Sequence, residues 1–583
     1  MKLVLGFVDD DVSLPPRSDF RTFQSDVWSF QTNLEESFCV DSEDITLLLN
    51  GYLYEKKEND LLYIQELYRK GGFEYLLKHL DGLFSLVLFD KKLQKLYLSR
   101  DHLGIYPLYY YKNKNTFLFS NDLKQFRDID AFEKEIDYAS LSLFFQHSFI
   151  PAPYTIFKNC YKLKPAHYLT FTLKEHRVDT KPYWDLHALY LEKKRDLDES
   201  VIVSKTEALL TKAIEDAIRE KKEVGSFLSG GFDSTTILAL LKQIGNTQNH
   251  TFTMGFENES YSEADIAKEI AKHLESHHDT YILQEEDVLH SLEDIATIYP
   301  EPFGDKAALA SSILLQEHAK KSEVFFGGEG GDELFYASSF LTKFKRLENI
   351  PYAMRRFIGF LLKLHPGVKY QKWGDIYKQR NLEDLLAYKD ILMSQRECQK
   401  LIQHAFRAHT IQISDRQRSP DSLDNFFPAI IQHYVSNNLL TKIGALSLYH
   451  DITIELPYLN RHLIEYLAKV SSSLKYKKET KKYLLKQITY KYVPKSIIDR
   501  PKKGFSVPLS ASLRANLDTI KKSYLSKEKI ENEAILDYNE VEKIVKQFLQ
   551  EDSFYAEQKF WNLLLFEVWY DYWFDQDKID KEM

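Results

Sequence analysis

The residues best suited to chemistry lie in the run SFLSGGFDSTT at residues 226–236. An apolar segment leads into Gly230 and Gly231, and a helical pattern of apolar residues begins at Ile237, which predicts a strand, a tight turn and a helix N-terminus. The first amides of a helix lack intrahelical partners, and glycines let the backbone approach an anion closely. Asp233 would repel a phosphate unless a divalent cation lay between them. The run therefore indicates a polyphosphate and Mg²⁺ site, with an ordinary turn and helix cap as the alternative.

A second glycine-rich turn, FGGEGGDEL at residues 326–334, has the same strand, turn and helix pattern. Alone it is typical of helix capping, because acidic residues are common at helix starts. Beside the first turn it gains meaning, since Asp233 and Asp332 follow two strands of one predicted sheet and are able to share a magnesium ion. The chain contains no GxxxxGK[ST] loop, the commonest competing phosphate motif.

The pattern SGGxDS of the first turn resembles the pyrophosphate loop of the ATP pyrophosphatases, which cleave ATP to AMP and pyrophosphate. Further blocks resemble the asparagine synthetase family in the same order along the chain: TFTMGF at 251–256, EPFGD at 301–305, GEGGDEL at 328–334 and RPKKGF at 500–505. The resemblance covers most of the chain and identifies it as a member of that family.

This resemblance implies that the cofactors are ATP and Mg²⁺, and it assigns roles to individual residues. Glu329 and Lys502 would be catalytic, and Asp233 and Asp332 would bind the metal. ATP would be bound by Leu228, Ser229, Gly230, Gly231, Asp233, Ser234, Met254, Gly328 and Lys482.

The chemistry of the family suits these residue types. When a substrate carboxylate attacks the α-phosphorus of ATP to form an acyl-adenylate, a cation such as Lys502 would stabilise the charge on the phosphate oxygens. Glu329 would accept the proton that the attacking amine loses. Spacing alone favours a solvated surface lysine at position 502, so the role of Lys502 depends on the resemblance.

The chain also departs from the family. Glutamine-dependent members begin, after methionine removal, with a cysteine nucleophile, whereas position 2 is Lys2, so we expect glutamine hydrolysis to be lost although the segments 50–51 and 80–82 still resemble the glutamine site. Gly444 and Ala445 stand where the family usually has Asp-Arg, and Glu455 stands where it usually has Arg. We expect these positions to lie in helices near the acyl-adenylate pocket, which argues against free aspartate as substrate.

The leading hypothesis is therefore an ATP-dependent amide ligase that uses an amine carried by its own substrate. The pattern resembles that of lasso-peptide cyclases, which join an Asp or Glu side chain to the α-amine of the same peptide, and of β-lactam synthetases. An asparagine synthetase that uses free ammonia and a non-catalytic nucleotide-binding remnant stay open as alternatives. The expected partners are a peptide or small carboxylate substrate and a precursor-peptide protease or recognition protein.

The elements that must position these residues divide the chain in two. Residues 1–190 are predicted to form a degenerate Ntn-type glutamine amidotransferase-like domain without its nucleophile, with antiparallel strands at 82–90, 95–99, 108–111 and 116–119. Strands at 226–228, 251–256, 280–283 and 324–326 alternate with helical segments, which predicts a parallel α/β sheet. The resemblance implies that residues 200–583 form an ATP pyrophosphatase domain. After about residue 340 we expect helices alone. The fold class is thus α+β followed by α/β with a helical C-terminal part.

Composition excludes several other classes. The net charge is −9 with acids and bases interspersed, so a nucleic acid is not expected as a partner. Three widely spaced cysteines, Cys39, Cys160 and Cys398, argue against a disulfide framework or a zinc site and favour a reducing compartment. The start does not resemble a signal peptide, and the apolar stretch at 560–574 contains polar residues unsuited to a membrane span. We expect a cytoplasmic protein without a membrane partner.

Overall fold

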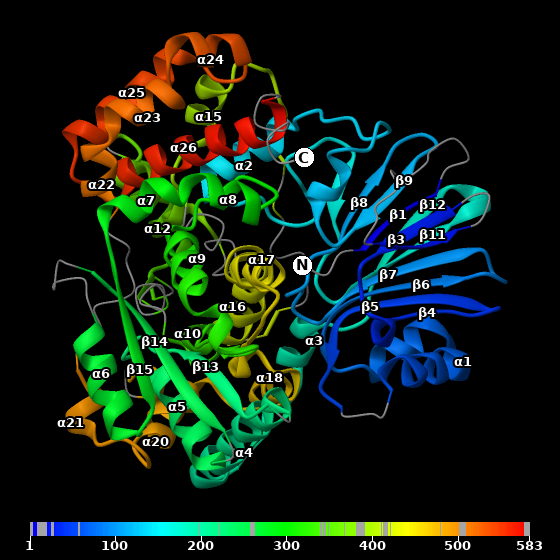
Figure 1. The fold of residues 1–583 in the computed structure, drawn as a ribbon. Helices are drawn as coiled ribbons and strands as arrows, with labels where there is room; N and C mark the ends of the chain where they lie inside the picture. Colours follow the sequence, from blue (N-terminus) through cyan, green and yellow to red (C-terminus); the bar gives the residue numbers. More distant parts are fainter. Residues whose placement is uncertain are drawn as a thin grey trace.

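The structure of the protein is a computed structural model (Figure 1). The structure describes residues 4–8, 20–24, 28–55, 59–195, 197–219, 221–245, 247–256, 263–337, 341, 346–347, 349–365, 368–380, 391–409, 411, 418–419, 421–477, 480–500 and 509–575. Lys2 and Lys502 lie outside these residues, so their predicted roles stay predictions.

Two six-stranded antiparallel sheets form the N-terminal half, which is blue and cyan in Figure 1. The first has the order β10-β8-β9-β1-β3-β2, with strands at Cys160–Lys162, Tyr109–Lys112, Phe117–Ser120, Val4–Val8, Trp28–Thr32 and Arg21–Gln24. The second has the order β12-β11-β7-β6-β5-β4, with strands at Arg177–Pro182, His167–Thr172, Lys95–Arg100, Gly82–Asp90, Ile45–Leu53 and Cys39–Asp41. The predicted hairpins are confirmed as β6–β7 and β8–β9.

The central strands β5 and β6 of the second sheet are buried on both faces, which explains their nearly continuous apolar sequences. Leu48 of β5 and Val87 of β6 pack toward the first sheet, together with Phe30 and Phe117. Their neighbours point to the opposite face, because successive side chains of a strand alternate. There Leu47, Leu49, Leu86 and Leu88 pack against helix α1 (Asp60–His79). The half is therefore a sandwich of two sheets with a helix on one outer face.

The second half is built on a five-stranded parallel sheet with the order β15-β14-β13-β16-β17. Its strands are His277–Leu283, Gln248–Phe256, Glu223–Phe227, Val324–Phe326 and Thr453–Glu455. Chain order runs outward from β13 to β15 and then returns to β16, so the switch point of the topology lies between β13 and β16. Ligands of such sheets bind beyond the carboxyl ends of the strands at this point. The predicted parallel sheet is confirmed.

Helices lie on both sides of this sheet (Figure 1), as right-handed crossovers require. Before residue 340 the described helices of this half are α4 (Glu199–Ile218), α5 (Phe232–Ile244), α6 (Ala264–His273), α7 (Glu285–His290), α8 (Leu292–Ile298), α9 (Lys306–His318) and α10 (Gly331–Leu334). The predicted domain boundary falls between α3 (Leu186–Leu191) and α4. The division itself stays a prediction.

The expectation that strands end near residue 340 is wrong, because β17 adds a fifth strand at the edge of the sheet. Around it the C-terminal part is helical, as predicted: α12 (Tyr352–Leu362), α13 (Val368–Lys378), α15 (Gln395–Leu401), α16 (Ser422–Ile430), a π-helix (Ile431–Leu439), α17 (Leu440–His450), α18 (Arg461–Ala468), α19 (Ser472–Lys475), α20 (Tyr483–Thr489), α21 (Lys495–Ile498), α22 (Ser510–Ala515), α23 (Leu517–Ser523), α24 (Lys527–Glu533), α25 (Tyr538–Gln550) and α26 (Phe554–Phe574). Among the residues that the structure describes, no helix has the length and apolar character that crossing a bilayer requires.

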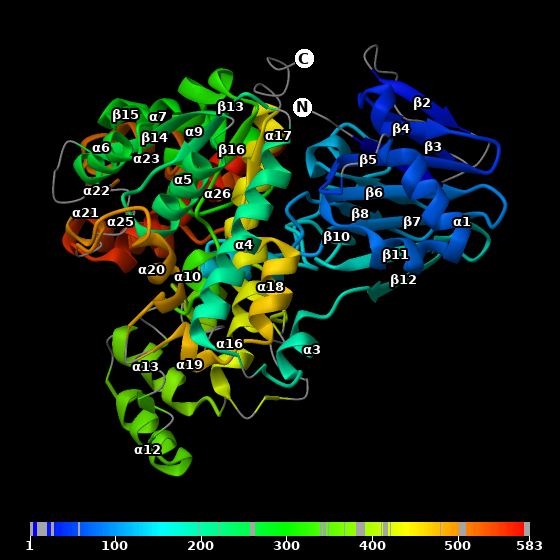
Figure 2. The same ribbon diagram turned by 90° about the horizontal axis from the view of Figure 1, so that it is seen from below.

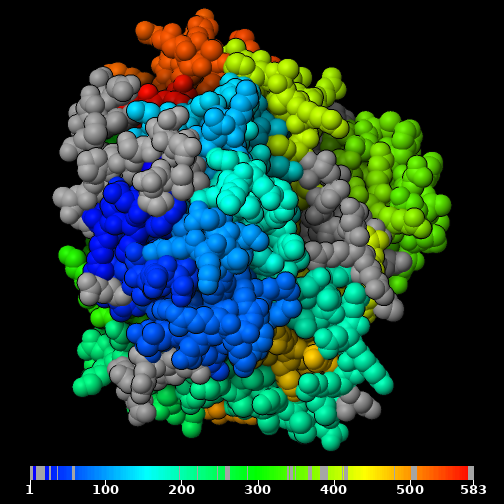
Figure 3. All heavy atoms as spheres, turned by 90° about the vertical axis from the view of Figure 1, so that its right-hand side faces the viewer, coloured from blue at the N-terminus to red at the C-terminus, as the bar shows by residue number. Residues whose placement is uncertain are grey.

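The two halves share one core and several buried polar contacts, and Figure 3 shows the N-terminal half spread over one face of the molecule with later segments around it. Lys162 and Glu301 form a buried ion pair across the interface at 2.6 Å. Gly444 of α17 lies against the N-terminal half so closely that a Cβ atom there would be 2.1 Å from the carbonyl oxygen of Ile105. This helix therefore needs a glycine where it meets the other half.

We expect Gly444→Ala to lower the free energy of unfolding by about 1–3 kcal/mol, because the added methyl group overpacks the interface. The direction of this change tests the close contact, because alanine in a helix that has space for it raises the free energy of unfolding by roughly 0.5–1 kcal/mol relative to glycine. Urea denaturation measures the change. Ala445→Ser, at the next residue of the same helix, is the control and should cost less, and a stabilising Gly444→Ala would refute the close contact.

Candidate active site

Both glycine-rich turns have the predicted strand, turn and helix geometry. The first turn joins β13 to α5, with Gly231 as the N-cap residue and Gly230 at φ 72°. It is closed by side chains, because the backbone N–H of Ser229 donates to the Ser234 hydroxyl at 3.2 Å. The second turn joins β16 to α10, where Gly330 has φ 87°. Left-handed backbone of this kind favours glycine.

The two turns touch each other at the switch point of the sheet. A Cβ atom on Gly331 would lie 2.5 Å from Oδ1 of Asp233, and one on Gly328 would lie 3.1 Å from the Asp233 Cβ atom. The Tyr458 hydroxyl, buried beneath the turns, donates to the backbone carbonyl of Asp233 at 2.8 Å. Because Gly328 and Gly331 have no side chains, the first turn and the Asp233 carboxylate are able to pack directly against the second turn.

Lys482 connects the carboxylates of the two turns. Its Nζ lies 2.6 Å from Oδ1 of Asp332 and also donates to Oδ2 of Asp233. Burial alone would lower the pKa of Lys482, but the two carboxylates outweigh burial and raise it. The amine is therefore a firmly held ammonium ion at the point where both acidic side chains converge.

This donor set fits the predicted magnesium site. Two carboxylates that contact one ammonium nitrogen are close enough to share one cation, and Mg²⁺ is commonly bound by one or two carboxylates together with substrate phosphates. Across the described part of the chain, no group of three or more His, Cys, Asp or Glu side chains suited to a metal occurs. Asp233 and Asp332 would therefore supply the protein ligands, with phosphate oxygens and water completing the shell.

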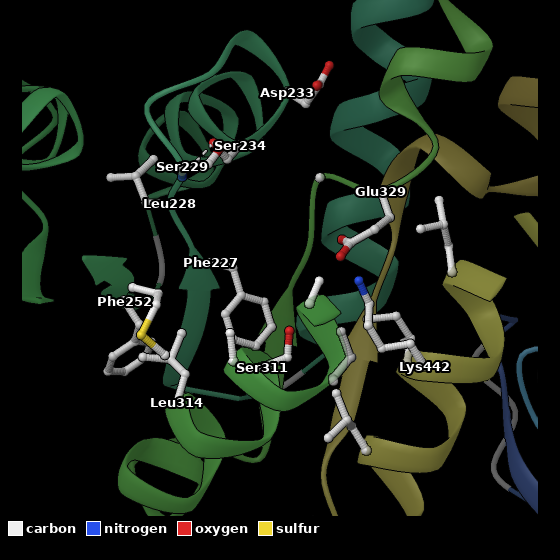
Figure 4. Close-up of a pocket in the computed structure, with 18 of the residues that line it drawn as sticks. Phe227, Leu228, Ser229, Asp233, Ser234, Phe252, Ser311, Leu314, Glu329 and Lys442 are labelled. Carbon is white, nitrogen blue, oxygen red and sulfur yellow. Dashed lines mark hydrogen bonds between the residues drawn. The ribbon is translucent and has the colours of Figure 1, made fainter. Parts of the chain in front are cut away.

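A cavity of about 420 Å³ opens beside the turns (Figure 4). The predicted residues that line it are Leu228, Ser229, Asp233, Ser234, Met254, Gly328, Glu329 and Asp332. Phe227, Phe252 and Leu314 add an apolar wall, which suits the faces of an aromatic base. Gly230 and Gly231 shape the turn, and Lys482 contacts the carboxylates. The structure thus brings the described residues of the predicted ATP site together, while their roles stay predictions.

Lys442 is the feature of this cavity that the sequence analysis missed. It lies on α17, is only 5% exposed, and has its Nζ 3.7 Å from Oδ2 of Asp305. Figure 4 shows its amino group pointing toward the carboxylate of Glu329. A lysine within the apolar pattern of residues 439–448 was the available signal, because burying an ammonium ion is costly unless it has a use or a partner. The cavity therefore ends in a cation and a carboxylate.

Two predicted acceptor-pocket positions lie elsewhere. Gly444 faces Ile105 at the interface between the halves, and Ala445 lines a small interface cavity beside Asn437. Their neighbours Ile443 and Lys442 face the cavity beside the two turns instead, because a helix turns about 100° per residue. The substitution of Asp-Arg by Gly-Ala therefore does not reshape the cavity wall directly.

Glu455 lies in strand β17 and not in a helix. It lines a separate cavity of about 220 Å³ between the halves, together with Asn50, Tyr52 and Arg219. Burial raises the pKa of Glu455 to about 8, and the Tyr54 hydroxyl donates to its Oε2 at 3.2 Å. Ile454, one residue earlier, lines the cavity beside the two turns, as strand alternation requires. Glu455 thus carries no argument against aspartate as substrate.

We expect Lys482→Met to lower the free energy of unfolding at pH 7 by about 3 kcal/mol, because two neighbouring carboxylates lose their shared cation. The pKa of Lys482 is raised in the folded state, so its contribution is complete below the unfolded value of about 10.4 and is lost as the pH rises further. Urea denaturation at several pH values measures this.

Magnesium chloride without ATP should then raise the melting temperature of Lys482→Met more than that of the parent protein, because the ion replaces the ammonium. Lys486→Met, which removes a more exposed lysine of the same helix that pairs with Asp499 at 3.2 Å, is the control and should change stability by less than about 1 kcal/mol. No magnesium effect on either protein, with ATP present as well as without it, would remove the metal site.

Comparison with known proteins agrees with this geometry. Residues 205–571 match the asparagine synthase family model and residues 42–184 match a glutamine amidotransferase domain. A putative glutamine-hydrolysing asparagine synthetase 2 of Methanocaldococcus jannaschii is 32% identical over 51% of this chain and 59% of its own length, so the match spans less than two thirds of that relative.

Two longer matches extend over both halves. Asparagine synthetase 1 of Bacillus subtilis, named as glutamine-hydrolysing, is 25% identical over 84% of this chain and 77% of its own length. A protein named amidase chry2 of Gibberella zeae is 24% identical over 81% of this chain and 78% of its own length. Since the family model covers more than half of the residues, the chain belongs to the asparagine synthase family and carries an amidotransferase-like domain in front of its synthase domain.

Proposed function

We propose that the protein is an ATP-dependent amide ligase that activates a carboxylate as an acyl-adenylate and releases pyrophosphate. The observation that carries this proposal is the meeting of Asp233 and Asp332, which line the cavity, with the amino group of Lys482. Membership of the asparagine synthase family supports it. The substrates of the first step are then ATP and a carboxylic acid.

We assign ATP binding to one end of the cavity and the carboxylate and amine substrates to the other. At one end, the amides of the first turn and the N-terminus of α5 would bind the pyrophosphate part of ATP, and Lys482 would hold the two carboxylates in place. Magnesium, bound by Asp233 and Asp332, would neutralise phosphate charge. Apolar side chains beyond the turn would contact the base.

At the other end, Lys442 would bind the carboxylate that is to be activated, and Glu329 would accept the proton that the attacking amine loses. Figure 4 shows both side chains directed into the same part of the cavity. A positively charged group and a base side by side suit a reaction that first orients an anion and then deprotonates an ammonium. Lys502 is proposed to stabilise the phosphate charge during adenylation.

We further propose that the amine and the carboxylate belong to one peptide, which the enzyme closes into a macrolactam as lasso-peptide cyclases do. Support comes from the cysteines, because Cys39, Cys160 and Cys398 are all buried and burial raises the pKa of the Cys160 and Cys398 thiols. None of these thiols suits nucleophilic release of ammonia from glutamine. The protein named as an amidase among the relatives is consistent with a substrate other than aspartate.

Ammonia-dependent asparagine synthesis is the second candidate. Its support is the naming of two relatives as asparagine synthetases, and the positions of Gly444 and Glu455 outside the nucleotide cavity remove one objection to aspartate. The two candidates give different products, a cyclised peptide or asparagine. Product analysis therefore separates the two candidates.

The decisive assay supplies ATP and magnesium with aspartate and ammonium, or with peptides that have a free N-terminus and an internal Asp or Glu. We expect pyrophosphate release with a peptide, and by mass spectrometry a product lighter by one water. Asparagine formation would establish the second candidate instead. Pyrophosphate release with neither substrate, despite ATP binding, would support a non-catalytic remnant.

Glu329→Gln should lower amide formation by about 10²–10⁴-fold, because a general base of this kind contributes that much. Pyrophosphate release with the acyl substrate should fall much less, since adenylation precedes deprotonation of the amine. Glu317→Gln, at an exposed position of α9, is the control and should leave both rates unchanged. Equal loss of both rates in Glu329→Gln would contradict its role as the base.

A further inference from the structure

Helices α12 and α13 form a hairpin that extends from the body of the molecule (Figure 2). The two helices cross at glycines: a Cβ atom on Gly359 would lie 2.8 Å from the carbonyl oxygen of Gly374, and one on Gly374 would lie 2.9 Å from that of Gly359. Lys363 pairs with Asp375 across the crossing. Helix α13 therefore covers the inner face of α12 around Gly359.

The outer face of α12 is apolar and exposed. Met354, Phe357 and Leu361 follow one another at helical spacing, with Phe360 and Leu364 beside them, and these five side chains are 47–67% exposed. Tyr352 and Tyr370 flank them. Of the 14 large hydrophobic side chains that are exposed in the described part of the chain, these seven lie in one hairpin. Such clustering marks an interaction surface, because scattered exposed residues are ordinary and clustered ones are not.

The same hairpin is strongly basic. Residues 352–380 contain seven Lys or Arg residues and one acidic residue, Asp375, whereas the whole chain has a net charge of −9. Not all of these charges reach the surface, since Arg355 is buried, Lys363 pairs with Asp375 and Lys372 donates to the Tyr555 hydroxyl at 3.1 Å. Arg356, beside Phe357, and Arg380, just beyond α13, are exposed. The surface thus offers apolar groups and positive charge together, and its partner must be apolar and negatively charged.

An anionic lipid bilayer has both properties. A helix with Phe and Leu on one face and Lys or Arg on its flanks lies in the interface, where apolar side chains enter the boundary of headgroups and acyl chains. Lys and Arg then contact acidic headgroups. The hairpin is a projecting ridge, a shape that suits a yielding planar surface, whereas a protein partner would have to supply a matching groove.

We propose that the α12–α13 hairpin docks the protein on the surface of anionic membranes without crossing them. This inference departs from the expectation, drawn from the sequence, that the protein has no membrane partner. It is independent of the proposed reaction, because none of the hairpin residues lines the nucleotide cavity. Docking would hold the active site close to a bilayer.

Co-sedimentation of the full chain with vesicles tests the proposal. The protein should bind phosphatidylcholine vesicles that contain phosphatidylglycerol, bind pure phosphatidylcholine vesicles at least tenfold more weakly, and dissociate as salt is added. Phe357→Asp with Phe360→Asp should lower binding at least tenfold, and Arg356→Glu should lower it on acidic vesicles. Leu549→Asp, at a comparably exposed site on α25, is the matched control and should bind as the parent does.

The folded state of each variant is checked by its melting temperature and by ATP-dependent activity, which the hairpin substitutions should not change. Failure of the parent protein to bind acidic vesicles, or unchanged binding of the double variant, overturns the proposal. Light scattering that shows a dimer broken by Phe357→Asp, with no vesicle binding, would assign the face to a second copy instead.

Discussion

The contact between the two glycine-rich turns is the constraint on which the rest of the structure depends. It requires β13 and β16 to be neighbours, and it requires glycine at position 331 so that the Asp233 carboxylate fits against the second turn. Two residues from the later helical part then hold the turns in place: the Tyr458 hydroxyl donates to the Asp233 carbonyl, and Lys482 pairs with the Asp332 carboxylate. Segments more than 200 residues apart in the sequence are thus combined in one small site.

The N-terminal half has a structural reason to persist whether or not it acts on glutamine. It supplies Lys162 to a buried ion pair with Glu301, and the backbone N–H of Ile156 donates to the same carboxylate at 2.9 Å. Asp81, in a segment that resembles the glutamine site, lies 3.2 Å from His462 of α18. Removing this half would take both partners from the Glu301 carboxylate and expose the shared apolar core to water, which is costly.

Local patterns predicted the parts of the site that are local in the chain. The turns at 226–236 and 326–334 combine strand, glycine and helix signals within a dozen residues, and both are confirmed. Strand β17 was missed because its residues Thr453–Glu455 form no apolar run, whereas the equally short β16 is apolar throughout and leads into a glycine-rich turn. Gly444 and Glu455 were placed wrongly because their surroundings come from the N-terminal half, and no pattern within α17 or β17 shows that contact. Lys502 lies outside the described residues, so its assignment stays a prediction.

The basic α12–α13 hairpin was not noticed in the sequence because its charged residues are spread over two helices and form no continuous run.

The buried carboxyl group of Glu455 links the union of the two halves to protons. Its pKa is about 8 when it is enclosed between them, against about 4.3 for an ordinary glutamate in water. A folded state that holds this proton more tightly than the unfolded chain loses stability as the pH rises between those two values. Below that range the group is neutral in both states, and above it the full cost of a buried charge is present. At neutral pH folding therefore adds a proton to Glu455 at the interface between the halves. Alkaline conditions remove this proton, and the interface then contains a buried negative charge.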